Sequence, residues 1–229
     1  MIRRRRRSPP TLRQLYQRLW KAFGPQRWWP ARTSFEMMAG AILTQAASWH
    51  NVERAIRRLK SARCLSARAL AERPASQIRA LVRSTGYFRQ KTERLRTFSQ
   101  WYRRTYGASA RRMFRRPTAR VRSELLALHG IGPETADSIL LYGGAHPVFV
   151  VDAYTRRVFG RHGLIRGDEP YEAIQQMVMD RLPAEPQLFN EFHALIVAVG
   201  KQYCHRRHPN CAACPLGSFP TNLEVTTHG

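Results

Sequence analysis

The stretch from Leu128 to Gly163 reads LHGIGPETADSILLYGGAHPVFVVDAYTRRVFGRHG, and our expectation for the fold starts there. Gly130 and Gly132 flank a single residue and can both adopt positive φ, so they predict a tight hairpin between two helices. Pro133 then opens the second helix, where its missing N–H costs nothing. Backbone N–H groups at such a turn attract an anion, phosphate above all.

One acid follows the hairpin at a defined place. Asp152 comes directly after the apolar, strand-like run 148–151 and directly before the helical pattern 153–159. This order predicts a carboxylate at a helix N-cap, just beyond a buried segment. Because an N-cap Asp more often has a structural role than a catalytic one, the position alone does not predict chemistry.

The two features together resemble a known family. L-x-G-I-G-x-x-T-A at 128–136, followed by V-F-V-V-D at 148–152, resembles the helix-hairpin-helix DNA glycosylases of the endonuclease III superfamily. The resemblance implies an all-α, two-domain fold with the active-site cleft between the domains. It also implies that His129, Gly130 and Gly132 contact DNA phosphates and that Asp152 does the chemistry.

The same resemblance divides the chain. Residues 1–33 and 147–229 are expected to form one helical domain, which includes a degenerate cysteine loop at 204–220. Residues 34–146 are expected to form a helical barrel with the helix-hairpin-helix at about 120–142. Apolar periodicity predicts helices over 11–23, from a Ser34 cap into 43–49, and over 51–60, 66–84, 95–106, 117–128, 154–162, 171–182 and 186–203.

Composition indicates the kind of partner. The chain has 229 residues, 43% of them hydrophobic, which suffices for one large or two small domains. Its 39 Lys and Arg against 15 acids give a net charge of +24, which predicts a polyanionic partner, although a compositional bias toward Arg also raises this value. We expect a monomer on double-stranded DNA that contains a damaged base.

The termini and apolar runs bear on location. No apolar run approaches the roughly 20 residues of a membrane span. The run from Arg3 to Arg7 lacks the apolar segment of a secretion signal and is expected to be a disordered basic arm. These features predict a cytoplasmic protein.

Three tryptophans are candidates for base binding. Trp28 and Trp29 are adjacent in a loop, so either one is buried and one exposed, or they form a stacking wall for a nucleobase. With Pro30 they resemble the Trp-Trp-Pro of the 3-methyladenine glycosylases. Trp49 either packs in the core or occupies the place where that branch carries an aromatic residue.

Two further residues match family segments. Gln45, in Leu43-Thr44-Gln45, matches the position whose glutamine fills the space left in the duplex by the extruded base. Lys91 ends a G-x-x-x-x-K turn and is a candidate phosphate contact, although a solvated lysine on a helix face is the simpler interpretation.

The cysteines leave three interpretations open. Cys204, Cys211 and Cys214 resemble three of the four ligands of the family's iron–sulfur loop, but the fourth position is Pro220, which cannot ligate. The loop is metal-free and vestigial, or it holds a [4Fe-4S] cluster with another fourth ligand, or His208 completes a zinc site with the three cysteines. Disulfides are not expected in a cytoplasmic protein, and the chemistry requires no cofactor.

Glu134 predicts the reaction type. In lyase-competent members of the family this position carries a lysine that forms a Schiff base, which a carboxylate cannot do. The sequence therefore predicts a monofunctional glycosylase, and the tryptophans favour a cationic alkylated purine such as 3-methyladenine. The alternatives are a bifunctional glycosylase and lyase acting on oxidised pyrimidines, and a non-catalytic DNA-binding protein.

Overall fold

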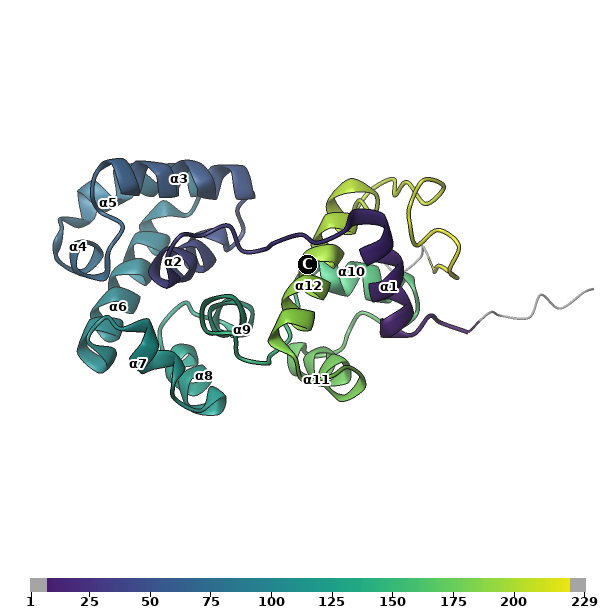
Figure 1. Ribbon diagram of the computed structural model, residues 1–229. Coiled ribbons are helices and arrows are strands. Elements are labelled where there is room, and N and C mark those ends of the chain that lie inside the picture. The colour runs from purple at the N-terminus through teal and green to yellow at the C-terminus, as the bar shows by residue number, and fades with distance from the viewer. Residues whose placement is uncertain (1–7, 223–229) are drawn as a thin grey trace, which may run out of the picture. The chain divides into compact units, whose positions relative to one another are not determined.

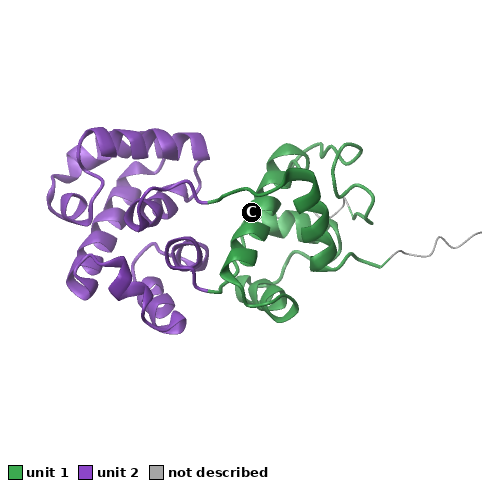
Figure 2. Ribbon diagram, viewed as in Figure 1, with its two compact units in different colours: residues 1–28, 147–229 green, residues 29–146 purple. Residues whose placement is uncertain are grey.

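The computed structural model describes residues 8–222, within which all regular elements are helical. This confirms the all-α expectation; the Arg3–Arg7 run lies outside the described residues. The chain divides into two compact units, residues 1–28 with 147–229 and residues 29–146 (Figure 2). The first boundary precedes the Ser34 boundary expected from the sequence. Within 8–222, each helix is too short or too polar to cross a bilayer.

The first unit contains α1 (Leu12–Phe23), α10 (Ala153–Arg161), α11 (Tyr171–Arg181) and α12 (Pro186–Gln202) (Figure 1). Its core is aromatic and centres on Phe192 of α12. The rings of Tyr16, Phe149 and Phe159 lie 5.8, 5.9 and 6.2 Å from that of Phe192. Since these rings come from α1, α10, α12 and the segment before α10, one cluster joins residues from both ends of the chain.

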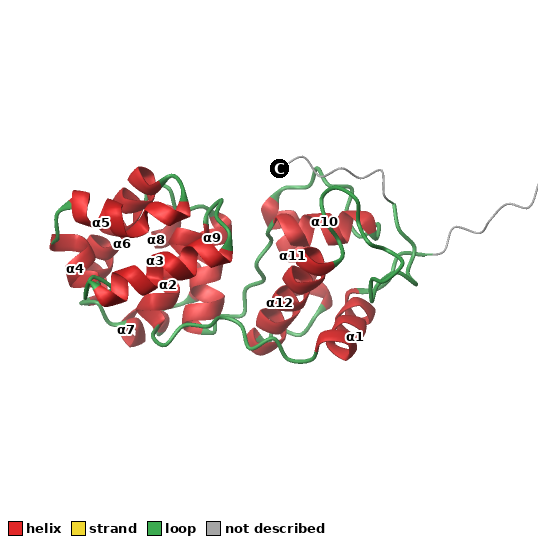
Figure 3. Cartoon of the chain, turned by 90° about the horizontal axis from the view of Figure 1, so that it is seen from above, coloured by secondary structure: helices red, strands yellow, loops and turns green. Residues whose placement is uncertain are grey.

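The second unit is built around a buried helix. Its elements are α2 (Ser34–Thr44), α3 (Trp49–Ser61), α4 (Ala67–Glu72), α5 (Ala75–Val82), η1 (Arg83–Thr85), α6 (Phe88–Tyr106), α7 (Ala110–Phe114), α8 (Thr118–Leu126), α9 (Pro133–Ser138) and the π-helical turn η2 (Ile139–Gly143), joined by loops (Figure 3). Residues 36–43 of α2 are all buried, and α2 contacts α3, α6, α9 and η2. An apolar helix packed on several sides explains why its sequence lacks a polar face.

Three helix boundaries differ from the sequence expectation. Thr33, not Ser34, caps α2, because its side chain accepts the Glu36 N–H. The helix expected over 66–84 breaks into α4 and α5 at Pro74, which has no N–H and holds the preceding residue extended, at φ −67° and ψ 153°. α6 begins at Phe88, within the segment 86–91 that was expected to be the turn into this helix, and the short α7 was not expected.

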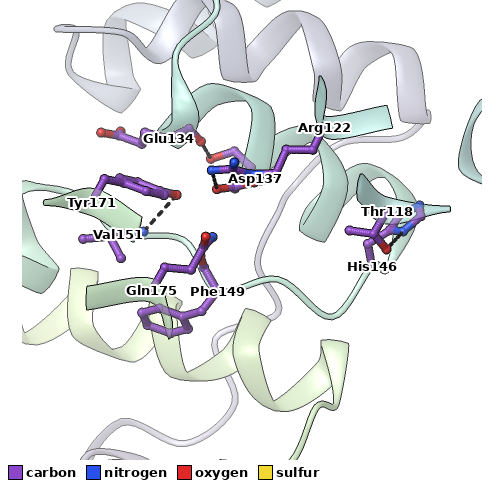
Figure 4. A network of polar contacts seen from close by, with 10 residues as sticks. Thr118, Arg122, Glu134, Asp137, His146, Phe149, Val151, Tyr171 and Gln175 are labelled. Carbon is purple, nitrogen blue, oxygen red and sulfur yellow. Dashed lines mark hydrogen bonds and ion pairs between the residues drawn. The ribbon is translucent and has the colours of Figure 1, made fainter. Parts of the chain in front are cut away.

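The segment 148–151 is extended and buried, but it is not a strand. Side chains of α11 satisfy its backbone instead: Gln175 Nε2 donates to the Phe149 carbonyl at 2.6 Å, and the Val151 N–H donates to Tyr171 Oη at 3.4 Å (Figure 4). These bonds are required because buried backbone groups without partners are costly. They fix the end of the segment, and therefore the start of α10 at Asp152.

Candidate active site and hairpin

The hairpin connects α8 to α9, and the two glycines in it have different conformations. Gly130 has φ +81°, where a Cβ is unfavourable. Gly132 is extended at φ −91° and ψ 178° and forms the N-cap of α9. The expectation of positive φ therefore holds for Gly130 and is wrong for Gly132. Residues 126–132, His129 among them, line an open hollow over the turn.

Gln45 lies against this hairpin. It follows the C-terminus of α2, and its Nε2 donates to the Gly130 carbonyl and to Thr135 Oγ1, both at 2.9 Å. Arg94 Nη1 donates to Gln45 Oε1 at 2.5 Å. The structure therefore brings together two residues that the sequence assigned separately to the duplex gap and to phosphate binding.

Lys91 has a different environment from the one expected. Its side chain is 0% exposed, and Nζ donates to the carbonyls of Leu43 at 2.9 Å and Thr85 at 2.6 Å. Burial, with a contribution from the charge of Arg94, lowers the pKa of Lys91 to about 8. A buried ammonium that donates to backbone carbonyls cannot reach a phosphate, so both interpretations of Lys91 from the sequence are corrected: it joins α2 to α6.

Two of the three candidate tryptophans pack together. Trp29 and Trp49 meet edge to face, with centroids 5.1 Å apart, and Trp29 also contacts Tyr142 at 5.5 Å. Trp29 lies over Gly40, where a Cβ would come within 3.2 Å of its ring. Trp29 and Trp49 are both partly exposed and line one pocket of the second unit, whereas Trp28, also partly exposed, belongs to the first unit.

Asp152 is the N-cap of α10, as expected. Its Oδ1 accepts the Thr155 N–H at 2.7 Å and the Thr155 hydroxyl at 3.0 Å. Its Oδ2 lies 3.5 Å from Nε2 of His193, with the two side chains 13% and 8% exposed. Burial alone would raise the pKa of Asp152, but the charge and hydrogen bond of His193 and the two bonds from Thr155 outweigh it, so the pKa is lowered.

Several residues that contact Asp152 or belong to the hairpin and its surroundings were not found from the sequence. His193 lies within the apolar pattern of α12, where a histidine next to Phe192 was the one available signal. Arg94 lies three residues after Lys91 on α6, and a turn of helix brings it to the hairpin. Asp137, which is fully buried, accepts from Arg122 Nε at 2.7 Å and Nη2 at 3.1 Å, and this pair ties α9 to α8 (Figure 4).

A side chain of α10, Arg161, forms hydrogen bonds to the cysteine loop. Cys204, Cys211 and Cys214 line one cavity with Arg161 and His162. Burial first, and the neighbouring thiols second, raise the pKa of Cys214. Arg161 donates to Cys204 Sγ at 3.1 Å, to the His205 carbonyl at 2.7 Å and to the Arg206 carbonyl at 3.1 Å.

The donor set of this loop does not match a four-cysteine cluster. His208 is exposed and absent from the cavity lining. Across residues 8–222, we find no set of three or more His, Cys, Asp or Glu side chains arranged to hold a metal ion. Three thiols and Pro220 at the fourth position leave the set one ligand short.

The profile of the HhH-GPD superfamily of base excision DNA repair proteins matches residues 39–184, more than half of the chain. The chain belongs to this superfamily. This HhH-GPD protein is 39% identical over 208 residues to a protein of Methanocaldococcus jannaschii that is provisionally named a DNA repair glycosylase. That match covers 90% of this chain and 94% of the relative.

Solved structures agree with this assignment. The H. pylori 3-methyladenine DNA glycosylase MagIII, solved with 1,N6-ethenoadenine, aligns with a TM-score of 0.70 and 29% identity, over 83% of this chain and 95% of that chain. A trapped endonuclease III–DNA covalent intermediate aligns with a TM-score of 0.78 over 90% of this chain and 94% of that chain; at 22% identity it supports the fold alone. The HhH-GPD protein is a DNA glycosylase of this family.

Proposed function

We propose that the protein is a monofunctional glycosylase, which hydrolyses the N-glycosidic bond of a flipped alkylated purine such as 3-methyladenine and leaves an abasic site. The observation that carries the proposal is the carboxylate of Asp152, held at the start of α10 by Thr155 with its second oxygen beside His193. An ionised acid that is held in place through one oxygen, with its second oxygen 3.5 Å from His193 Nε2, fits the charge that develops on the sugar.

The reaction requires few groups. A base in a duplex must first leave the stack, at a cost of a few kcal/mol. When the C1′–N bond breaks, its electron pair leaves with the base and positive charge develops on the sugar. Asp152 stabilises that charge and accepts a proton from the water whose oxygen bonds to C1′. The N-terminus of α10 favours the ionised form of Asp152 throughout.

Glu134 supports hydrolysis without strand cleavage. It lies in the first turn of α9 and is exposed. The helix N-terminus stabilises a carboxylate at this position, but a carboxylate cannot attack C1′ to form an imine. A lyase would need an amine from elsewhere in the chain.

The candidate tryptophans and the similarity to MagIII both support an alkylated purine as the substrate. Indole faces attract cationic bases, and Trp28, Trp29 and Trp49 are all partly exposed. The likeness to MagIII, a 3-methyladenine glycosylase, points to the same class of base. We expect Trp49→Ala to reduce 3-methyladenine release more than release of other bases.

For the cysteine loop we propose a metal-free structure. Arg161 supports this proposal, since its guanidinium bonds to one thiol and two carbonyls of the loop. The catalytic steps above use no metal.

Base release from duplexes that carry methylated, oxidised or deaminated bases tests the proposal. We expect release of 3-methyladenine without strand cleavage, and a reduction of about 10²-fold or more in Asp152→Asn with DNA binding retained. Borohydride should trap no covalent complex with abasic DNA. Full activity of Asp152→Asn would refute the mechanism, and a borohydride-trapped complex would establish the bifunctional alternative.

A further inference from the structure

Arg94 of α6 lies directly against the turn of the hairpin. A Cβ built on Gly130 would fall 2.3 Å from Arg94 Nε and 2.8 Å from its Cδ. Contacts this short mean that the side chain of Arg94 extends along the backbone of Gly130 and would have to shift if that position carried a Cβ. Packing against Gly130 therefore places the guanidinium of Arg94 at the hairpin.

The guanidinium is also held in orientation. Arg94 Nη1 donates to Gln45 Oε1 at 2.5 Å, and Gln45 Nε2 is itself fixed by the Gly130 carbonyl and Thr135 Oγ1, both at 2.9 Å. Because both ends of the Gln45 amide are occupied, the amide cannot rotate without losing three hydrogen bonds. Gln45 thus fixes the orientation of the Arg94 guanidinium.

Among residues 8–222, Arg94 takes part in no ion pair. Gln45 accepts the one hydrogen bond that the structure records for the five N–H groups of the Arg94 guanidinium. Lys91, a cation on the same helix, has its pKa lowered first by burial and then by the charge of Arg94. A half-buried, oriented cation without a carboxylate is an arrangement suited to binding an anion.

We infer that Arg94 binds a phosphodiester of the DNA backbone at the hairpin, where it supplies the positive charge that the sequence had suggested for Lys91. Arg94 is the suitable residue type, because its planar fork of donors matches phosphate oxygens. The hollow over residues 126–132 leaves space for a DNA strand beside Gly130. The inference adds a residue to the DNA-binding function and does not depend on the base that is removed.

Binding of a fluorescent duplex across a series of salt concentrations tests this inference. Each phosphate contact contributes about 0.9 to the slope of log K against log salt, so Arg94→Gln should lower the slope by about one. An undamaged duplex and a duplex with an abasic analogue should weaken alike, because backbone contacts carry no base information. Arg94→Lys should keep most of the slope, since the charge remains.

Arg104→Gln is the matched control. It removes the same charge from an exposed position near the far end of α6, and we expect a smaller change in slope. Thermal unfolding of each variant separates lost folding from lost binding. An Arg94→Gln slope equal to wild type, or equal loss in Arg94→Lys and Arg94→Gln, would overturn the inference. Because base release is not measured, this result is independent of the proposed reaction.

Discussion

At Asp152 the two carboxylate oxygens have different partners. Oδ1 is occupied by the N–H and hydroxyl of Thr155, as in a structural N-cap, whereas Oδ2 faces His193. The choice between a structural and a catalytic role, which the sequence left open, is therefore not exclusive. Oδ1 holds α10 in place, whereas the proposed reaction requires Oδ2, which lies 3.5 Å from His193 Nε2, to meet the sugar and the water.

The pairing with His193 predicts a pH effect. Asp152 is useful when ionised, and its lowered pKa extends the ionised form toward acid pH. His193→Phe removes the charge and hydrogen bond that lower this pKa, so the acid limb of the single-turnover pH–rate profile should move to higher pH. His193→Gln keeps a donor without the charge and should lie between. An acid limb that stays in place in His193→Phe would show that His193 does not act on Asp152.

At the scale of elements, the hairpin shows that two similar glycines can have different physical reasons. Gly130 combines φ +81° with the close approach of Arg94, whereas Gly132 has an ordinary extended conformation and open space where a Cβ would stand. The spacing of the glycines predicted the turn, but the pattern alone could not show which of them the turn requires.

This asymmetry predicts unequal effects of alanine. Gly130→Ala should lower the free energy of unfolding by about 1–2 kcal/mol or more from the positive φ alone, and should weaken DNA binding as Arg94 is displaced. Gly132→Ala is its matched control and should stay within about 0.5 kcal/mol of wild type. Urea unfolding and duplex binding measure both. Equal losses in the two variants would contradict the structural distinction.

At the scale of the whole molecule, the cysteine loop connects the C-terminal part of the chain to α10. Arg161 of α10 reaches three atoms of the loop, and the Asn222 N–H donates back to the Arg161 carbonyl at 2.6 Å. A guanidinium thus makes connections of the kind that a cluster would make through its ligands. This explains how a loop with Pro220 at a ligand position can keep a defined structure.

A metal-free loop has measurable consequences. Purified protein should contain no stoichiometric iron or zinc, show no absorbance band near about 400 nm of the cluster type, and unfold at the same temperature with a chelator. Arg161→Gln should destabilise the protein by roughly 1–3 kcal/mol, because the buried Cys204 thiol and two partly buried carbonyls lose a charged donor. Arg207→Gln, exposed in the same loop, is the control. Bound metal, or unfolding by the chelator, would favour one of the two metal interpretations.

Features that depend on near neighbours in the chain could be predicted from the residues alone. Backbone sterics predicted the hairpin around Gly130, and helix capping predicted the N-cap at Asp152. Side-chain chemistry predicted that Glu134 cannot form an imine. The helices followed from apolar periodicity, with errors where a proline or a capping side chain decided the boundary, as at Pro74 and Thr33.

Contacts between residues far apart in the chain became known from the folded structure. Gln45 reaches Gly130 across 85 positions of the chain, and Lys91 reaches Leu43 across 48, so no local pattern could assign their partners. The contacts of His193 with Asp152 and of Arg94 with Gln45 also join residues that are far apart in the sequence. A side chain's burial and charge environment depend on the helices that pack around it, and that packing exists only once the whole chain has folded.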